Sequence, residues 1–209
     1  MSTLAIVQAR WASQRFPGKA LADLHGQPVI WHVLMRAGAI PVVDRVVLAL
    51  AESDRDTPLG QWALTHAPGT VRFVDRPVED VLGRFADIVR AEAPQYVCRV
   101  TADCPMLEPS VCARVWQLLR DVGCDYVWTD TGRGDYPDGF DCEAMTADVL
   151  LRAHAAATDP SDREHCTPWI RRHARVWALA PDPVYYEWPK LSIDTPEDLC
   201  RIRALMPTG

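Results

Sequence analysis

Short apolar runs rich in β-branched residues alternate with amphipathic segments along the first 122 residues. The apolar runs predict buried strands, at 4–8, 45–51, 71–74 and 96–101. The segments that separate and follow them carry apolar residues at helical spacing, which predicts helices at 28–39, 57–66, 81–92 and 109–122. Alternation of strand and helix is typical of an α/β fold, in which helices cover both faces of a mainly parallel sheet.

The pattern is less regular after residue 125. It predicts further strands at 125–128, 140–144, 176–180 and 191–193, and further helices at 147–157 and 162–173. A closing helix is expected after Thr195, which is a suitable N-cap because Pro196 follows it and acidic residues occupy the first turn. We expect one domain over residues 1–209. Within it, the stretch 129–189 is rich in proline, aspartate and aromatic residues and is predicted to leave the sheet, as a substrate wall or a dimer contact.

Composition narrows the classes of partner. The formal net charge of −6 argues against a broad surface for nucleic acid or for an anionic membrane, so local basic clusters are interpreted as sites for small anions. No stretch approaches the length of a membrane span, and no leader-like segment begins the sequence. Seven cysteines, an odd number without a C-x-x-C pair, predict reduced thiols. We therefore expect a cytoplasmic protein.

A basic loop follows the first predicted strand. Arg10, Arg15 and Lys19 lie within ten residues of one another, together with the Ser13 hydroxyl. Loops at the carboxyl ends of parallel strands are where such sheets bind ligands, and three neighbouring cations repel one another unless an anion collects them. The loop lacks the glycine spacing of a P-loop. A nucleoside triphosphate is the expected ligand, and a solvated basic loop is the alternative.

Two aspartates are expected to meet this loop. If the first four strands follow the order 3-2-1-4, the first and fourth are neighbours, and Asp103 faces the loop across a crevice. Asp194 follows the predicted strand at 191–193. Carboxylates beside a polyphosphate suggest a bridging Mg²⁺, which prefers oxygen ligands. The alternative for Asp194 is that it only helps to cap the closing helix.

Five segments in this order resemble the cytidylyltransferase family that includes CMP-Kdo synthetases and acylneuraminate cytidylyltransferases. The resemblance is greatest to the branch of the spore coat polysaccharide biosynthesis protein F. The segments are 8–19, the stretch around Asp103, 136–143, 161–165 and 192–199. The resemblance implies a nucleotide-diphospho-sugar transferase fold of the Rossmann-like kind, with a mixed, mostly parallel sheet. It also implies a homodimer and a reaction of CTP with a sugar acid that yields a CMP-sugar and pyrophosphate.

The resemblance also implies roles for individual residues. Nucleotide-binding roles fall on Ala9, Arg10, Ser13, Arg15, Lys19, Asp80, Arg84 and Asp103. Acceptor-binding roles fall on Asp138, Asp141, Glu143, Arg163, Glu164 and His165. Lys19, Arg15 and Asp103 would be catalytic, and Asp103 and Asp194 would hold Mg²⁺.

Several alternatives remain open from the sequence. The chain could be a nucleotidyltransferase of the same fold that uses another nucleoside triphosphate or a phosphonate acceptor. It could also be a non-catalytic nucleotide-binding or glycosyltransferase-like protein that kept the scaffold. For Arg171 and Arg172, a solvated helix face is expected rather than a site.

Overall fold

The computed structural model describes residues 1–130, 136–185 and 187–206. They form a seven-stranded sheet with the order β5-β4-β1-β6-β8-β7-β9. Its strands are β1 (Thr3–Gln8), β4 (Arg45–Ala51), β5 (Val71–Val74), β6 (Tyr96–Thr101), β7 (Tyr126–Thr129), β8 (Cys142–Thr146) and β9 (Val176–Leu179). A two-stranded hairpin, β2 (Asp23–Leu24) with β3 (Gln27–Pro28), stands apart from this sheet.

The sheet is mixed and mostly parallel, as predicted. β5, β4, β1 and β6 are parallel neighbours, which confirms the 3-2-1-4 order of the first four strands. β8 runs antiparallel to both β6 and β7, and β9 is parallel to β7. The stretch 129–189 thus supplies β8 and β9 to the sheet as well as helices outside it.

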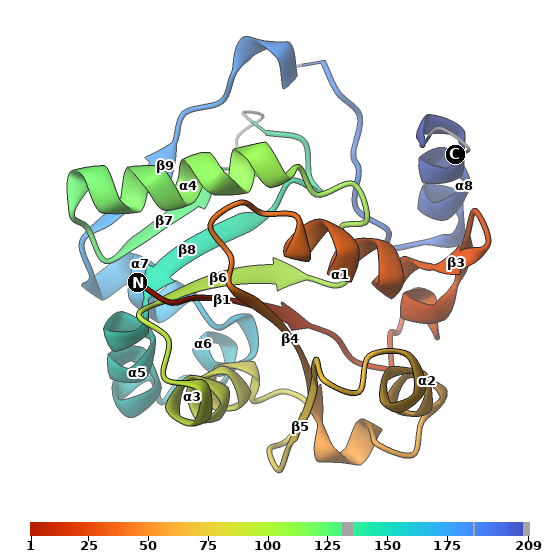
Figure 1. The fold of residues 1–209 in the computed structure, drawn as a ribbon, viewed down its shortest axis with the longest axis horizontal. Helices are drawn as coiled ribbons and strands as arrows, with labels where there is room; N and C mark the ends of the chain where they lie inside the picture. The colour runs from red at the N-terminus through yellow and green to blue at the C-terminus, as the bar shows by residue number, and fades with distance from the viewer. Residues whose placement is uncertain (131–135, 186, 207–209) are drawn as a thin grey trace.

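Helices cover both faces of the sheet (Figure 1). One face carries α1 (Val29–Gly38), α2 (Pro58–His66), α4 (Pro109–Val122) and α8 (Pro196–Leu205). The other carries α3 (Val81–Glu92), α5 (Ala147–Ala156), α6 (Pro160–His165) and α7 (Pro168–His173). Along β1, Leu4 and Ile6 are buried against the second layer while Ala5 and Val7 are buried against the first. Burial on both faces explains why the strand is a continuous apolar run.

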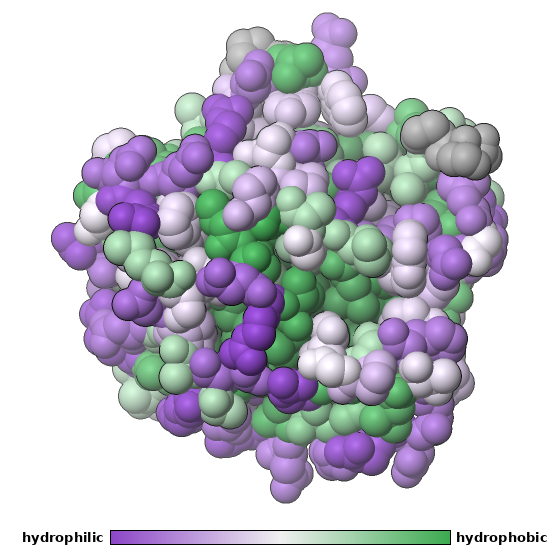
Figure 2. All heavy atoms as spheres, viewed as in Figure 1, coloured by the Kyte–Doolittle hydropathy of each residue, from purple (hydrophilic) through white to green (hydrophobic). Residues whose placement is uncertain are grey.

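Apolar and hydrophilic groups are also separated on the surface. On the face shown in Figure 2, apolar groups gather near the centre, between the helices, and hydrophilic groups cover most of the rim. Within the described part of the chain, no helix is long and apolar enough to cross a membrane.

Two predictions of secondary structure are wrong. The segment 191–193 bends at Ser192 and joins neither sheet, because its backbone N–H groups bind the carbonyls of Asp138 and Asp103 instead of a strand. The helix expected at 162–173 is two helices, α6 and α7. Cys166 between them has a φ of 69°, which ends the first helix, and Pro168, which lacks an N–H, begins the second at its first position.

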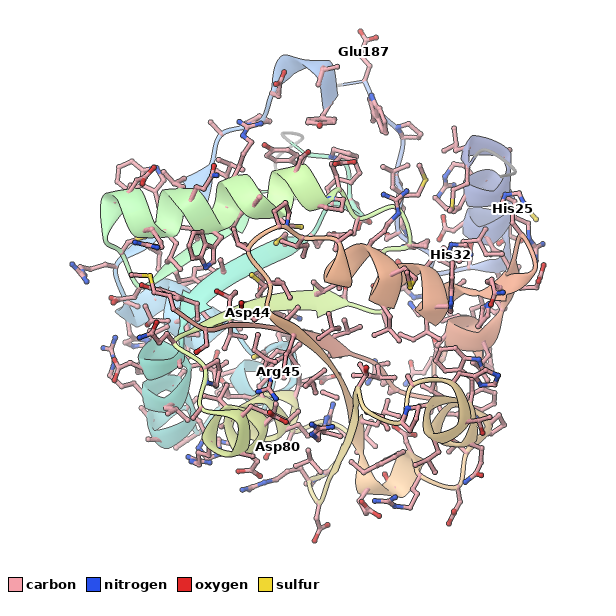
Figure 3. The ribbon with its side chains drawn as sticks, in the orientation of Figure 1. His25, His32, Asp44, Arg45, Asp80 and Glu187 are labelled. Atoms are coloured by element: carbon pink, nitrogen blue, oxygen red, sulfur yellow. The ribbon has the colours of Figure 1, made fainter. Side chains whose placement is uncertain are left out.

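Capping interactions fix several helix starts close to the predicted positions. Thr57 caps α2, and Thr195 forms a reciprocal capping box with Asp198 at the start of α8. At the other end of α8, the His25 ring contacts the carbonyl of Arg203 at 3.0 Å, which ties the β2–β3 hairpin to this helix (Figure 3). The last helix and the first loop are thereby held on the same side of the molecule.

Gly139 holds the segment before α8 in place. Its φ is 115°, and a Cβ at this position would lie 2.4 Å from the carbonyl carbon of Leu191. The adjacent Asp138 carbonyl accepts hydrogen bonds from the N–H groups of Leu191 and Ser192. Only a glycine permits this close approach, which brings Asp194 to the carboxyl ends of the strands.

Replacing Gly139 by alanine should therefore destabilise the fold. The positive φ and the clash with Leu191 together should lower the free energy of unfolding by at least about 2 kcal/mol, as measured by urea denaturation. Gly69→Ala is the control, because a Cβ at Gly69 meets no neighbour, and its effect should stay within about 0.5 kcal/mol. Equal stabilities of the two variants would contradict this explanation.

Candidate active site

The loop after β1 is held in shape by one aromatic side chain and one glycine. Gly18 adopts a φ of 72° immediately before a short 3₁₀ helix, Lys19–Leu21. A Cβ on Gly18 would meet the Trp11 ring at 3.0 Å, so the ring lies directly against the glycine. The backbone N–H of Trp11 in turn donates to Oδ1 of the buried Asp54 carboxylate, with the nitrogen 3.4 Å from the oxygen. The loop is therefore folded back on itself, with its basic side chains at the ends of the strands.

Lys19 lies between the two predicted aspartates. Its Nζ donates to Oδ2 of Asp103 at 2.8 Å, to Oδ1 of Asp194 at 3.3 Å and to the carbonyl of Ile193 at 2.8 Å. The Ile193 N–H also donates to the Asp103 carbonyl at 2.8 Å. Three segments that are distant in the sequence thus meet at one ammonium group.

Asp194 is surrounded by cations. Arg15 donates to its Oδ1 at 2.9 Å, and Lys190 donates to its Oδ2 at 2.8 Å. Burial alone would raise the pKa of Asp194, but the hydrogen bonds and charges of Lys190 and Lys19 outweigh burial, so the pKa lies below its ordinary value. Asp198 accepts hydrogen bonds from Lys190 and from the Asp194 N–H. Asp194 does not cap α8, because Thr195 and Asp198 do so.

A cavity of about 650 Å³ opens at the carboxyl ends of β1 and β6. Ten of the residues predicted for the site line it, drawn from the basic loop, the two aspartate segments and helices α3 and α6. They are Ala9, Arg10, Ser13, Arg15, Lys19, Arg84, Asp103, Glu164, His165 and Asp194. The structure therefore brings together most of the predicted nucleotide-side residues and two of the predicted acceptor-side residues.

The Arg10 side chain reaches across the cavity toward α6. Its guanidinium lies 3.5 Å from the Glu164 carboxylate, and both side chains are about half exposed. His165 lines the same wall. Such an exposed ion pair contributes little to stability, so a ligand can displace it at low cost.

Asp80 and Arg163 pair with each other instead of lining the cavity. Asp80 caps α3 by accepting the Gly83 N–H at 3.0 Å, and its carboxylate binds Arg163 at 2.9 Å. Figure 3 shows Asp80 at the start of α3, on the face of the sheet that this helix covers. The pair joins α3 to α6. Their predicted ligand contacts remain predictions, and the contacts that the structure shows are structural.

Three predicted acceptor residues lie beyond the first cavity. The side chain of Asp138 lies 3.9 Å from Lys190. Asp141 and Glu143 line a second cavity of about 250 Å³ beside β7 and β8. Glu143 is 7% exposed and lies between two arginines, with Arg99 at 2.9 Å and Arg171 at 3.0 Å.

Arg171 does not lie on a purely solvated face, contrary to the sequence-based expectation. It bonds to the Tyr126 hydroxyl at 3.0 Å and lies over the Trp128 ring, in addition to pairing with Glu143. The reason is the break before α7, which turns this helix so that Arg171 reaches β7 and β8. Arg172 pairs with the buried carboxylate of Asp162.

Sequence reasoning missed Arg99, Asp54 and Lys190. Arg99 lines the floor of the first cavity, where it binds the Gln8 side chain at 2.8 Å as well as Glu143. A charged residue in the middle of the apolar strand 96–101 was the available signal, because a buried charge needs a partner. Lys190 also carried a signal, since it and Lys19 are the only lysines in the sequence and both contact Asp194.

The donor set at this site fits a magnesium ion. Asp103 and Asp194 each place an oxygen within hydrogen-bond distance of the same Lys19 nitrogen, so one cation can contact both carboxylates. Among the described residues, no group of three or more histidine, cysteine or acidic side chains is arranged to hold a metal by itself. Two carboxylates completed by phosphate oxygens and water suit Mg²⁺, which is rarely bound by protein ligands alone.

Comparison with known proteins agrees with this geometry. Residues 4–203 match the family model of the cytidylyltransferases. The chain belongs to this family. It is therefore a nucleotidyltransferase, and the cations and carboxylates at the first cavity lie where the fold is expected to bind ligands.

Individual relatives give the same assignment. The chain is 31% identical to the spore coat polysaccharide biosynthesis protein SpsF of Bacillus subtilis, over 97% of this chain and 85% of that protein. It is 28% identical to the 3-deoxy-manno-octulosonate cytidylyltransferase of Sodalis glossinidius, over 98% and 86% of the two chains. A relative that is named a cytidylyltransferase thus matches nearly the whole length of this chain.

Solved structures of cytidylyltransferases share the fold. A cytidylyltransferase from Leptospira borgpetersenii superposes with a TM-score of 0.82 at 23% identity, over 95% of this chain and 83% of that chain. A CMP:2-keto-3-deoxy-manno-octonic acid synthetase complexed with CTP superposes with a TM-score of 0.72 at 19% identity, over 99% and 98%. The fold is that of the nucleotide-diphospho-sugar transferases, as predicted.

The ion pairs of Glu143 should contribute strongly to stability. Glu143→Gln leaves the Arg99 charge buried without its carboxylate, which should lower the free energy of unfolding by about 3–5 kcal/mol in chemical denaturation. The two arginines hold the pKa of Glu143 below its ordinary value despite burial. Its contribution is therefore present at neutral pH and lost as the pH falls through the folded-state pKa, so wild type and variant should converge in acid.

The control for this prediction is Asp148→Asn, which removes an exposed partner of Arg152 on α5. Its cost should be about 0.5 kcal/mol or less. Equal losses for the two variants at neutral pH, or a Glu143→Gln deficit that does not shrink on acidification, would disprove the assigned role.

Proposed function

We propose that this enzyme transfers a cytidylyl group from CTP to a sugar acid, which yields a CMP-sugar and pyrophosphate. The observation that carries the proposal is the meeting of Lys19, Asp103 and Asp194 at the cavity, beside Arg15. The named activity of the octulosonate cytidylyltransferase relative and the CTP held by a structural neighbour support the choice of nucleotide and acceptor. The name of the SpsF relative supports a role in polysaccharide biosynthesis.

In the proposed reaction, an acceptor oxygen attacks the α-phosphorus of CTP. The bond from the α-phosphorus to the oxygen that bridges to the β-phosphate breaks, and pyrophosphate leaves. Such transfers depend mainly on positioning and on stabilisation of charge. Lys19 and Arg15 would bind the triphosphate, with Arg10 and the Ser13 hydroxyl contributing from the same loop. The two cations would then stabilise the charge that grows on pyrophosphate.

Binding of the triphosphate requires Lys19 to exchange partners. In the structure its ammonium donates to Asp103, Asp194 and the Ile193 carbonyl. Asp103 and Asp194 would hold Mg²⁺, which would supply positive charge to offset that of the triphosphate. Lys19 would exchange its carboxylate partners for oxygens of the triphosphate.

The acceptor is proposed to enter from the side of α6. Glu164 and His165 line the cavity there, and both are candidates to take the proton of the attacking hydroxyl. Beyond them, Arg99 and Glu143 connect this cavity to the second one, which Asp141 and Arg171 also line. The roles of Asp138, Asp141, Glu143 and Arg163 toward an acceptor belong to this proposal.

The deciding experiment tests purified protein with Mg²⁺ against a panel of nucleoside triphosphates and sugar acids. Pyrophosphate release should occur with CTP and depend on a nonulosonic or other sugar acid. Selective turnover of another nucleotide, or of a phosphonate acceptor, would instead identify a different nucleotidyltransferase of this fold. Nucleotide binding without pyrophosphate release under any acceptor would indicate a non-catalytic protein.

The same assay on variants tests the proposed roles of the two aspartates and of Lys19. Asp103→Asn and Asp194→Asn should each reduce kcat/KM for CTP by about 100-fold or more, because each removes a carboxylate that would hold Mg²⁺. Lys19→Arg should also be impaired, since a planar fork does not replace a compact ammonium. Asp121→Asn, at an exposed position of α4, is the control. Near-wild-type turnover of Asp103→Asn would remove this residue from the mechanism.

We also propose that the protein is a cytoplasmic homodimer. All seven cysteines are described and free, which suits a reducing compartment. The edge strand β9 exposes Trp177 at 54%, and aromatic side chains are enriched at interfaces. Light scattering after gel filtration should give twice the mass of the chain, and Trp177→Glu should give one chain. A monomeric wild-type protein would refute the dimer.

A further inference from the structure

The two oxygens of the Asp194 carboxylate contact different sets of cations. Oδ1 accepts from Arg15 at 2.9 Å and from Lys19 at 3.3 Å, whereas Oδ2 accepts from Lys190 at 2.8 Å. Arg15, Lys19 and Asp194 line the first cavity, but Lys190 is not among the described residues that line either cavity. A ligand in the cavity can therefore replace the partners of Oδ1 without displacing the partner of Oδ2.

Helix α8 holds Lys190 in place at both its side chain and its backbone. The ammonium also donates to Oδ2 of Asp198 at 3.2 Å, and the same oxygen accepts the N–H groups of Asp194 and Thr195 at 2.8 and 3.0 Å. The Lys190 carbonyl accepts a hydrogen bond from Nε of Arg201 at 3.0 Å. Lys190 thus joins the Asp194 side chain to the same Asp198 oxygen that holds the Asp194 backbone.

This network limits how Asp194 can bind a cation. A divalent ion that replaces Lys19 would meet Oδ1, while Oδ2 stays bound to Lys190. Mg²⁺ requires nearly ideal octahedral geometry, so a carboxylate that rotates freely is a poor ligand for it. Partners that hydrogen-bond to a metal's ligands orient them and support metal affinity.

The charge of Lys190 acts in the opposite direction. An ammonium group close to a divalent ion repels it, so removal of this charge by itself would strengthen metal binding. Loss of orientation would weaken metal binding. The sign of the change on substitution therefore separates a positioning role from a purely electrostatic one.

We propose that Lys190 is a positioning residue, which fixes the Asp194 carboxylate so that Oδ1 alone is presented to the divalent ion that accompanies the nucleotide. This inference rests on the proposed function, since it assumes that Asp194 meets a metal–nucleotide complex in the first cavity. Lys190 itself would contact neither the nucleotide nor the metal.

Calorimetry without acceptor tests the proposal, with the α,β-methylene analogue of CTP as ligand. Its dissociation constant is measured once in excess Mg²⁺ and once in EDTA, and the ratio of the two gives the enhancement of binding by the metal. Lys190→Met keeps a side chain of similar length but loses the donor and the charge, and Asp198 keeps its ion pair with Arg201. The enhancement should fall roughly tenfold to a hundredfold in this variant.

Two further variants serve as rescue and control. Lys190→Arg restores a cationic donor suited to carboxylates, so the enhancement should return to within about threefold of wild type. Arg175→Gln also removes one positive charge, but its partner is Asp125, at an exposed position away from both cavities. It should leave the enhancement within about threefold of wild type, because charges so far away are screened.

Three results would overturn the inference. A larger enhancement in Lys190→Met would show that Lys190 acts only through its charge. An unchanged enhancement, with a lower melting temperature, would show a purely structural role. Failure of the wild-type protein to bind the analogue in either condition would overturn the proposed use of CTP and this inference with it, and it is recognised without any variant.

Discussion

The site depends on one ammonium group shared by two carboxylates. Lys19 comes from the loop after β1, Asp103 from the turn after β6 and Asp194 from the segment before α8, and the lysine nitrogen contacts both acids and the Ile193 carbonyl. Two partly buried carboxylates so close together would repel each other without a cation between them. The same electrostatic requirement that holds Lys19 between the two carboxylates also makes the location suitable for a metal-bound polyphosphate.

The surrounding structure keeps these groups in position. Gly139 allows the Leu191 backbone to pass close by, while Lys190 and Asp198 hold Asp194 from behind. On the floor, the Arg99–Glu143 pair crosses from β6 to β8 and links the first cavity with the second. The antiparallel strand β8 is what makes this link possible, because it places Glu143 directly opposite Arg99 in the sheet register.

Much of this arrangement could be predicted from the sequence. Strands buried on both faces are continuous apolar runs, so β1, β4, β5 and β6 were evident, and their order placed Asp103 beside the basic loop. The segment at Leu191 was predicted as a strand, because an isolated apolar run does not reveal that its backbone will pair with the Asp138 and Asp103 carbonyls.

The acceptor side was harder to predict. Glu143 is an ion-pair partner of Arg99 and Arg171, and these contacts join residues 44 and 28 positions apart along the chain. Neither partner is visible in local sequence spacing. Asp80 and Arg163 were assigned to ligands from a family resemblance, whereas the structure shows them bound to each other. Arg84 is 2% exposed and donates to the carbonyls of Pro77 and Val78, which local spacing also did not indicate.

Lys19, Asp103 and Asp194 are proposed to converge on one polyphosphate and a divalent ion. A crystal structure with the α,β-methylene analogue of CTP and Mn²⁺, in which anomalous scattering locates the metal, tests this arrangement. We expect a manganese peak coordinated by both aspartates and by phosphate oxygens, with the Lys19 ammonium bound to the triphosphate. A metal bound away from Asp103 and Asp194, or phosphates out of reach of Lys19, would contradict it.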